Sequence, residues 1–175
     1  PDAFANAPTF TSMPEDISGI IPFNLSTYPQ PLIIQWQVSD VEDDVEDMNF
    51  TITSDDINLN DLTVLSNGIS GNSGSPYSNG NILFTINPNQ LSAGNYTITC
   101  TITDNDFNTN SNDVNISLTQ TPNEELVITG GGNVSQTLPY DSTSTSNTEE
   151  KTITWVVTDP ESQPFNWEFK KDSDE

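Results

Sequence analysis

The amino-acid sequence predicts an all-β protein built from antiparallel β-sandwich modules. Three observations predict this class: apolar residues that alternate with polar ones at a period of two, turn-rich segments between these runs, and no useful run with the spacing of an amphipathic helix. Alternation of this kind places one face of each strand in the core and leaves the other in water. Several short strands separated by polar loops are typical of a sandwich.

Five segments show this alternation, and their apolar side chains are expected to form the core. In the clearest segment, 96–103, four threonines point outward between four inward-facing residues. The segment from Ser66 to Gly80 is rich in turn residues and is expected to form a long loop. The five predicted strands with their inward residues are 32–39 (Leu32, Ile34, Trp36, Val38), 48–53 (Met48, Phe50, Ile52), 82–86 (Ile82, Phe84, Ile86), 96–103 (Tyr96, Ile98, Cys100, Ile102) and 114–118 (Val114, Ile116, Leu118).

An internal repeat divides the chain. Residue i matches residue i+119 without a gap, so that Trp36 aligns with Trp155, and both tryptophans are expected in a core. The repeat predicts a linker from a preceding module at 1–6, a complete module at 7–120, a linker at 121–125 and the first half of a second module at 126–175. The missing strands either follow in the same polypeptide, the simpler reading, or come from another chain by β-addition. Because the chain begins with Pro1 and shows no signal peptide, we interpret it as a mature or excised segment.

The charge is strongly one-sided. The chain has 26 acidic residues against three lysines, no arginine and no histidine, so its formal net charge is −23. All three cations, Lys151, Lys170 and Lys171, follow residue 150, so residues 1–150 cannot form a side-chain salt bridge. Salt or bound metal must therefore balance the charge. Nucleic acid and anionic membrane surfaces are disfavoured as partners, and no run approaches the roughly 20 apolar residues of a membrane span.

Several motifs resemble the Ig-like, cadherin-like and PKD-type repeats of large bacterial and archaeal cell-surface proteins. These motifs are Ala7-Pro-Thr, Val38-Ser-Asp-Val-Glu, Val157-Thr-Asp-Pro-Glu, Leu91-Ser-Ala-Gly-Asn-Tyr-Thr-Ile-Thr and Thr103-Asp-Asn-Asp. The resemblance implies tandem Ig-like modules in extracellular stalks, adhesins, fibres or surface-layer lattices, often stiffened by calcium. The acidic loop after residue 40 and the long segment from Ser66 to Gly80 depart from the usual pattern.

Two acidic loops are predicted to meet at one pole of the first module. Six of the eight residues from 40 to 47 are acidic, and in an Ig-like sandwich this loop emerges beside the loop at 104–112. Clustered carboxylate and amide oxygens suit Ca²⁺, which takes six to eight oxygen ligands. Neither loop fits an EF-hand, and diffuse Na⁺ around solvated acids is the alternative. The candidate ligands are Asp40, Glu42, Asp43, Asp44, Asp104, Asp106 and Asn108, of which Asp40 and Glu42 are favoured because they recur in the repeat.

The repeat places a second candidate calcium site at the junction between the modules. Asp159 and Glu161 stand where Asp40 and Glu42 stand in the first module. By resemblance to cadherin-like junctions, Asn123, Glu124 and Glu125 are candidate ligands from the linker. An ordinary polar linker is the alternative.

Enzymatic activity is not expected. Without histidine, and with one cysteine and no cation before Lys151, the complete module cannot use Ser-His-Asp, Cys-His or lysine chemistry. Paired carboxylates that cleave glycosides need one acid in an apolar setting, which a loop crowded with exposed acids does not offer. Cys100, which can form no intramolecular disulfide, is expected to be a small core residue.

The function predicted is that of a segment of a long extracellular structural or adhesive protein with calcium-stiffened Ig-like repeats. Its expected partners are the neighbouring repeats, with lateral self-assembly into fibres or a lattice as a further expectation. A surface-layer lattice component and a carbohydrate-binding accessory module are the alternatives. The carbohydrate-binding alternative requires a flat outward platform of aromatic side chains, for which the candidates are Tyr28, Tyr77, Tyr140 and Trp167.

Overall fold

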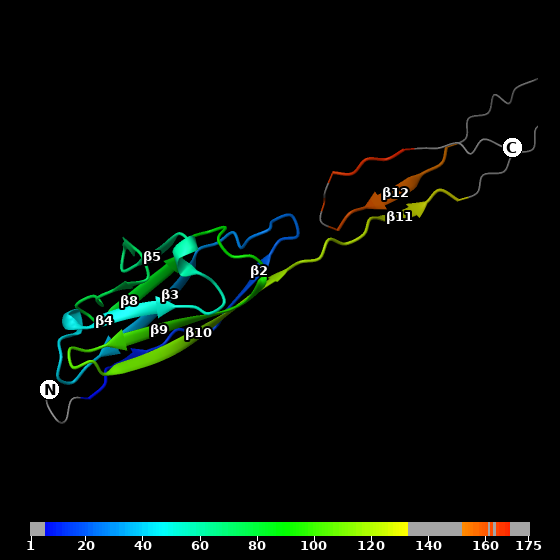
Figure 1. The fold of residues 1–175 in the computed structure, drawn as a ribbon. Coiled ribbons are helices and arrows are strands. Elements are labelled where there is room, and N and C mark those ends of the chain that lie inside the picture. The colour runs from blue at the N-terminus through cyan, green and yellow to red at the C-terminus, as the bar shows by residue number, and fades with distance from the viewer. Residues whose placement is uncertain (1–5, 133–151, 161, 163, 169–175) are drawn as a thin grey trace, which may run out of the picture. The chain divides into compact units, whose positions relative to one another are not determined.

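The computed structural model describes residues 6–132, 152–160, 162 and 164–168. The chain divides into two compact units, Pro1–Thr121 and Pro122–Glu175 (Figure 1). The first unit is an Ig-like β-sandwich of two five-stranded sheets, and the described part of the second forms a two-stranded sheet. No helix in the described ranges is long and apolar enough to cross a membrane.

The two sheets of the first unit are built from strands that are far apart in the sequence. Two short 3-10 helices, η1 (Val45–Asp47) and η2 (Leu59–Asp61), lie in the connections. One sheet has the order β1 (Thr9–Ser12), β3 (Leu32–Ser39), β8 (Asn81–Ile86), β5 (Val64–Ser66) and β6 (Ile69–Ser70). The other has the order β2 (Ile17–Ile21), β10 (Thr109–Gln120), β9 (Gly94–Thr103), β4 (Asn49–Thr53) and β7 (Ser73–Gly74).

The predicted inward faces form the core between these sheets. All the apolar residues predicted to face inward in the five segments are buried, except Tyr96, which is partly buried against the core. Cys100 is fully buried as expected, and this burial raises the pKa of its thiol to about 12. The indole N–H of Trp36 donates to Oδ1 of Asn112 across the core at 2.8 Å, so this buried donor is satisfied.

Three features of the first unit differ from the prediction. The strands β1, β2 and β5 were not predicted. Strand β2 pairs with β10 in parallel, from Ile17 opposite Ile116 to Ile21 opposite Gln120. The segment from Ser66 to Gly80 is not a plain loop, because it contains β6 and β7. The second acidic loop is shorter than predicted, since β10 already begins at Thr109.

The hairpin between β5 and β6 follows from two residues that tolerate left-handed backbone. Asn67 and Gly68 have φ values of 47° and 77° and connect the paired residues Ser66 and Ile69. A two-residue loop with two positive φ values matches the twist of the flanking strands, and Asn-Gly is the preferred sequence for it. The Asn-Gly dipeptide was therefore a signal for this hairpin.

The chain enters and leaves the first unit at opposite ends. At one end, Thr9 pairs with Ser39, directly before the first acidic loop. At the other end, β2 and β10 finish side by side, and the N–H of Thr121 donates to the carbonyl of Ile21 at 2.9 Å (Figure 1). We call the first end the entry pole (residues 6–8, 40–48 and 104–108) and the second the exit pole (residues 22–26, 92–93 and 120–121).

In the second unit, β11 (Val127–Gly130) pairs antiparallel with β12 (Trp155–Thr158). Ile128 lies opposite Val157, just as Phe10 lies opposite Val38 in the first unit. The expectation that Trp155 is a core residue is wrong for this structure, because its side chain is 40% exposed. Only two strands are described in this unit, so no second sheet covers the indole within the described residues.

Candidate functional site

The entry pole brings both acidic loops and the incoming chain together. The backbone N–H of Asn105 donates to Oδ2 of Asp43 at 3.3 Å, which links the loop after β3 to the loop after β9. Nδ2 of Asn110 donates to the carbonyl of Pro8 at 2.9 Å, and the amide of Asn6 donates to the carboxylate of Glu42. Side chains from three segments far apart in the sequence therefore meet at this pole.

Asp40 organises the first loop. Its Oδ1 accepts hydrogen bonds from the backbone N–H groups of Glu42 at 2.8 Å and Asp43 at 3.2 Å. Burial alone raises the pKa of Asp40, but these hydrogen bonds favour the ionised form and hold the pKa below its usual value. The second oxygen, Oδ2, is buried and has no hydrogen-bond partner among the described residues.

Asp104 organises the second loop. It is buried, with 5% of its surface exposed. Its two oxygens accept from the backbone N–H of Asn108 at 2.8 Å and from the side-chain amide of Asn108 at 3.0 Å. The turn closes at Phe107, which has φ 68° and donates its N–H to the carbonyl of Asp104 at 3.3 Å. Asp104 and Asn108 thus bind each other within the loop.

The fit of this pole to a calcium ion can be judged from two observations. Asp40 Oδ2 is a buried anionic oxygen that lacks a donor, and the described residues contain no lysine, arginine or histidine to supply one. However, no three acidic, histidine or cysteine side chains in the described ranges are arranged to hold a metal ion. The predicted ligands instead accept hydrogen bonds from backbone N–H groups and asparagine amides.

Most of the other predicted ligands are exposed at the surface. Asp44 and Asp106 are exposed on their loops, and Asn123, Glu124 and Glu125 are exposed in the segment before β11. Asp159 is partly buried and follows Thr158, which pairs with Val127, so the linker enters the sheet beside the Asp159 loop. Glu161 lies outside the described residues.

Sequence reasoning missed Asn6 as a residue of the entry pole. Asn6 was assigned to the linker without a role, although it stands 119 positions before Glu125, a predicted linker ligand. The repeat therefore contained the signal for Asn6. The contact of Asn110 with Pro8 was not predicted, because it depends on how β1 and β10 approach each other.

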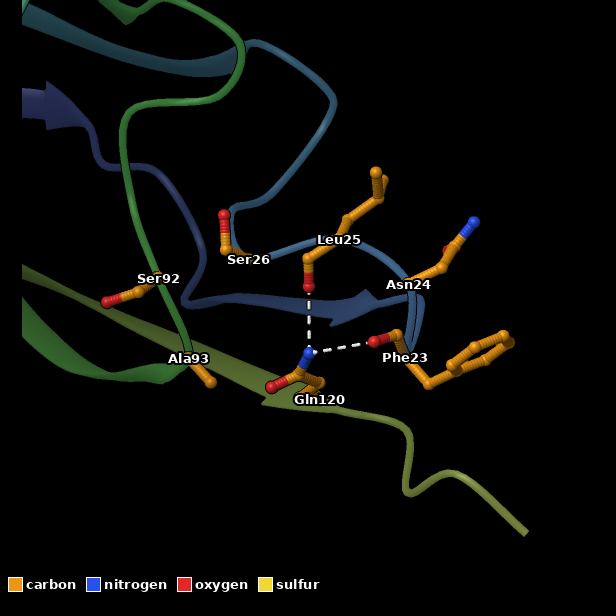
Figure 2. Close-up of a pocket in the computed structure, with 7 residues that line it drawn as sticks. All are labelled: Phe23, Asn24, Leu25, Ser26, Ser92, Ala93 and Gln120. Carbon is orange, nitrogen blue, oxygen red and sulfur yellow. Dashed lines mark hydrogen bonds between the residues drawn. The ribbon is translucent and has the colours of Figure 1, made fainter.

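The exit pole has an open depression of about 500 Å³ lined by Phe23, Asn24, Leu25, Ser26, Ser92, Ala93 and Gln120 (Figure 2). The side-chain amide of Gln120 lies here, and its Nε2 donates to the carbonyls of Leu25 at 2.7 Å and Phe23 at 3.3 Å. These bonds attach the loop after β2 to the last residue of β10. The depression is shallow and polar. The hydrogen bonds of Gln120 hold its two walls together at the point where the chain leaves the unit.

The described candidates for an aromatic platform lie in different settings. Tyr28 packs against the core, and its ring lies against Gly19. Tyr77 is 42% exposed in the first unit, and Trp167 is 74% exposed in the second. Tyr140 lies outside the described residues.

Comparison with known proteins finds structures with a similar fold but identifies no family. No protein-family model matches the chain, and no curated protein matches its sequence. Similar solved structures include the N-terminal Ig1-2 module of the Drosophila receptor protein tyrosine phosphatase DLAR, at 11% identity and a TM-score of 0.47, with 71% of this chain and 56% of that chain covered. The chain therefore matches only about half of that module.

Two further solved structures show a similar likeness. The tandem Ig repeats of Dlar match at 15% identity and a TM-score of 0.40, with 73% of this chain and 57% of that chain covered. A conjugative transposon lipoprotein from Bacteroides eggerthii matches at 10% identity and a TM-score of 0.42, with 63% of this chain and 94% of that chain covered. The assignment of the Ig-like fold rests on the sheets of the first unit.

Proposed function

We propose that the chain is a segment of an extracellular structural or adhesive protein in which Ig-like units act as load-bearing spacers. The observation that supports this most is the entry and exit of the chain at opposite ends of the first unit. Force applied along the chain would act along β2 and β10, which are paired in parallel over five residues. All hydrogen bonds of that pairing would then be loaded at once, in shear.

The composition supports a location outside the cell. A net charge of −23 keeps a chain soluble but makes it repel itself, and surrounding salt relieves this repulsion. The outward faces of β4 and β9 carry mainly threonine, which is suited to a strand with one wet face. The neighbouring Ig-like units of the same polypeptide are the partners that this arrangement requires.

A calcium ion at the entry pole is part of the proposal. Asp40 and Glu42 belong to the loop that meets the incoming residues 6–8, so an ion there would connect the unit to the preceding segment. The buried Oδ2 of Asp40 supports this, since a cation would satisfy it. Asp159 and the linker residues 123–125 would hold a second ion in the same manner.

Antibody labelling of the source cells tests the proposed location. An antibody against the first unit is expected to label intact cells, and brief protease treatment of intact cells should remove the signal. A cytoplasmic protein serves as the control and should be labelled only after permeabilisation. Labelling of the Ig-like unit that also required permeabilisation would contradict an extracellular role.

A further inference from the structure

The two outer faces of the first unit differ in charge. The strands of the sheet β1-β3-β8-β5-β6 contain no acidic or basic residue. On the other sheet, Asp113 of β10 is exposed and accepts a hydrogen bond from the hydroxyl of Thr99 at 2.7 Å. The carboxylate of Asp16 accepts from the backbone N–H of Asn115 in the same strand at 2.8 Å. One sheet of this strongly acidic chain is therefore built entirely from uncharged strands.

The uncharged sheet also carries apolar side chains on its outer face. Ile33 of β3 and Leu65 of β5 both lie opposite Thr85 of β8, and Leu83 shares this face because it is two residues from Thr85. Ile33 is 60% exposed and Leu65 is 39% exposed, whereas Leu83 is partly buried. We call this surface the neutral face, and its residues are Ile33, Gln35, Gln37, Leu65, Leu83 and Thr85.

Charge indicates which partner the neutral face suits. Each copy of the chain carries a net charge of −23, and like charges placed opposite each other in an interface oppose binding. On the neutral face, two copies can touch without bringing carboxylates of these strands together, and burial of Ile33 and Leu65 favours the contact. A basic partner would instead be drawn to the entry pole, where six of the eight residues 40–47 are acidic.

The two poles indicate the direction in which the copies pack. The entry pole begins at Asp40, directly after β3, and carries the acids of both loops. The exit-pole segments 22–26, 92–93 and 120–121 contain no charged residue. Parallel packing would place two acidic entry poles side by side, whereas antiparallel packing places each entry pole beside an uncharged exit pole. A two-fold axis produces the antiparallel arrangement with the same surface on both copies.

We propose that the neutral face binds the neutral face of a second copy of this chain, with the two copies antiparallel. The eight residues of β3 and the four strands from β1 to β5 give the face dimensions of about 26 Å by about 19 Å, or roughly 500 Å² on each copy. A total of about 1,000 Å² lies at the lower end of specific interfaces, so the dimer is expected to be reversible. This self-association goes beyond the load-bearing role and does not depend on it.

Sedimentation of the 175-residue chain tests the proposal. The chain is studied in chelator at concentrations from about 5 to about 500 µM, the range in which a small interface is expected to dissociate. The weight-average mass should rise from that of a monomer toward that of a dimer. Association should tighten severalfold between about 50 and about 500 mM NaCl, because salt screens the repulsion between acids outside the face.

Two isoleucines of similar exposure provide matched variants. Ile33 lies on the neutral face and is 60% exposed, whereas Ile20 lies in β2 of the other sheet and is 64% exposed. Ile33→Glu is expected to weaken the dimer by about tenfold or more, because it places a carboxylate of each copy in the interface. Ile20→Glu adds the same charge and should leave the dissociation constant within about twofold.

Cross-linking provides a second measurement in case Ile33→Glu disturbs folding. Gln35→Cys places a thiol near the middle of β3, and Thr9→Cys places one at the entry-pole end of the same face, where Thr9 pairs with Ser39. Both variants also carry Cys100→Ala. Antiparallel packing brings the two copies of residue 35 together and separates the two copies of residue 9. A short bismaleimide should therefore join Gln35→Cys into dimers and leave Thr9→Cys mostly monomeric.

Four results would overturn the proposal. The first is a chain that stays monomeric at every concentration. The second is equal association of Ile33→Glu and Ile20→Glu, because another surface would then join the copies. The third is association that weakens as salt is raised, which would indicate ion pairs instead of a neutral contact. The fourth is cross-linking of Thr9→Cys as efficient as that of Gln35→Cys, which would exclude antiparallel packing.

Discussion

At the scale of single residues, a side-chain hydrogen bond links the two sheets of the first unit. Trp36 fills the core, and its indole N–H requires an acceptor because a buried donor without one costs free energy. Asn112 supplies this acceptor from the opposite sheet. The alternation in 32–39 predicted that Trp36 faces inward, but its partner 76 residues away depends on the packing of the sheets.

Asn112→Ala is expected to lower the free energy of unfolding of the first unit by about 1–3 kcal/mol, because the indole N–H of Trp36 loses its acceptor. Urea denaturation followed by circular dichroism measures this change. Thr119→Ala, at an exposed position of the same strand, is the control and should change stability far less. Equal stability of Asn112→Ala and the unmodified chain would show that this hydrogen bond contributes little.

The lowered pKa of Asp40 predicts that the stability of the first unit depends on pH. Its pKa is lowered from the usual 3.8 in the folded chain, so its contribution to stability is complete above pH 3.8 and is lost as the pH falls through the lower folded value. Asp40→Asn should therefore be less stable than the unmodified chain at pH 7, and the difference should narrow at pH 3. Urea denaturation at the two pH values measures this.

Glu46→Gln is the control for Asp40, because it removes one charge from an exposed position of the same loop. Its difference from the unmodified chain should stay small at both pH values. A difference for Asp40→Asn that is the same at pH 7 and pH 3 would contradict the role assigned to the hydrogen bonds at Asp40.

At the scale of elements, the sequence pattern predicts some strands and not others. The five alternating segments were all found, because a half-buried strand leaves a pattern with a period of two. The strands β1, β2 and β5 were not predicted. Only Phe10 of β1 packs against the core, β2 lies at an edge of its sheet, and β5 has only three residues. The pairing of β2 with β10 in parallel could not be predicted, because a sequence pattern specifies the faces of a strand and not its neighbours.

The entry pole was likewise predictable only in part from the sequence. The prediction that both acidic loops meet there is confirmed by the bond between Asn105 and Asp43. Which oxygen accepts from which donor could not be predicted, because this depends on turns such as the one at Phe107. The local sequence specified the presence of acids, and the fold specified their hydrogen-bond partners.

Hydrogen exchange should follow the position of each strand in its sheet. The amides of β9 lie between β10 and β4, and they are expected to exchange only on global unfolding of the first unit. The two-residue edge strands β6 and β7 should exchange at least a hundredfold faster. Mass spectrometry of peptic fragments measures both. Similar protection of β7 and β9 would contradict the strand order.

At the scale of the whole molecule, the charge predicts a response to cations. A bound ion stabilises the folded state by mass action, whereas diffuse counterions act through ionic strength alone. The melting temperature of the chain is therefore expected to rise by several degrees in millimolar Ca²⁺ relative to chelator at fixed ionic strength. Asp40→Asn combined with Glu42→Gln should reduce this rise, and Mg²⁺ is the control for a non-specific divalent effect. An unchanged melting temperature in Ca²⁺ would contradict the proposed ion.

The central claim is that the first unit bears load between its opposite poles, and single-molecule stretching tests it most directly. Handles at Ala7 and Thr121 load β2 against β10 in shear, whereas handles at the paired, exposed residues Asn95 and Ser117 open β9 and β10 one hydrogen bond at a time. Both forms carry Cys100→Ala, so that the handles attach only at introduced cysteines. The account predicts a rupture force several-fold higher for the first pair than for the second. Equal rupture forces for the two pairs would contradict it.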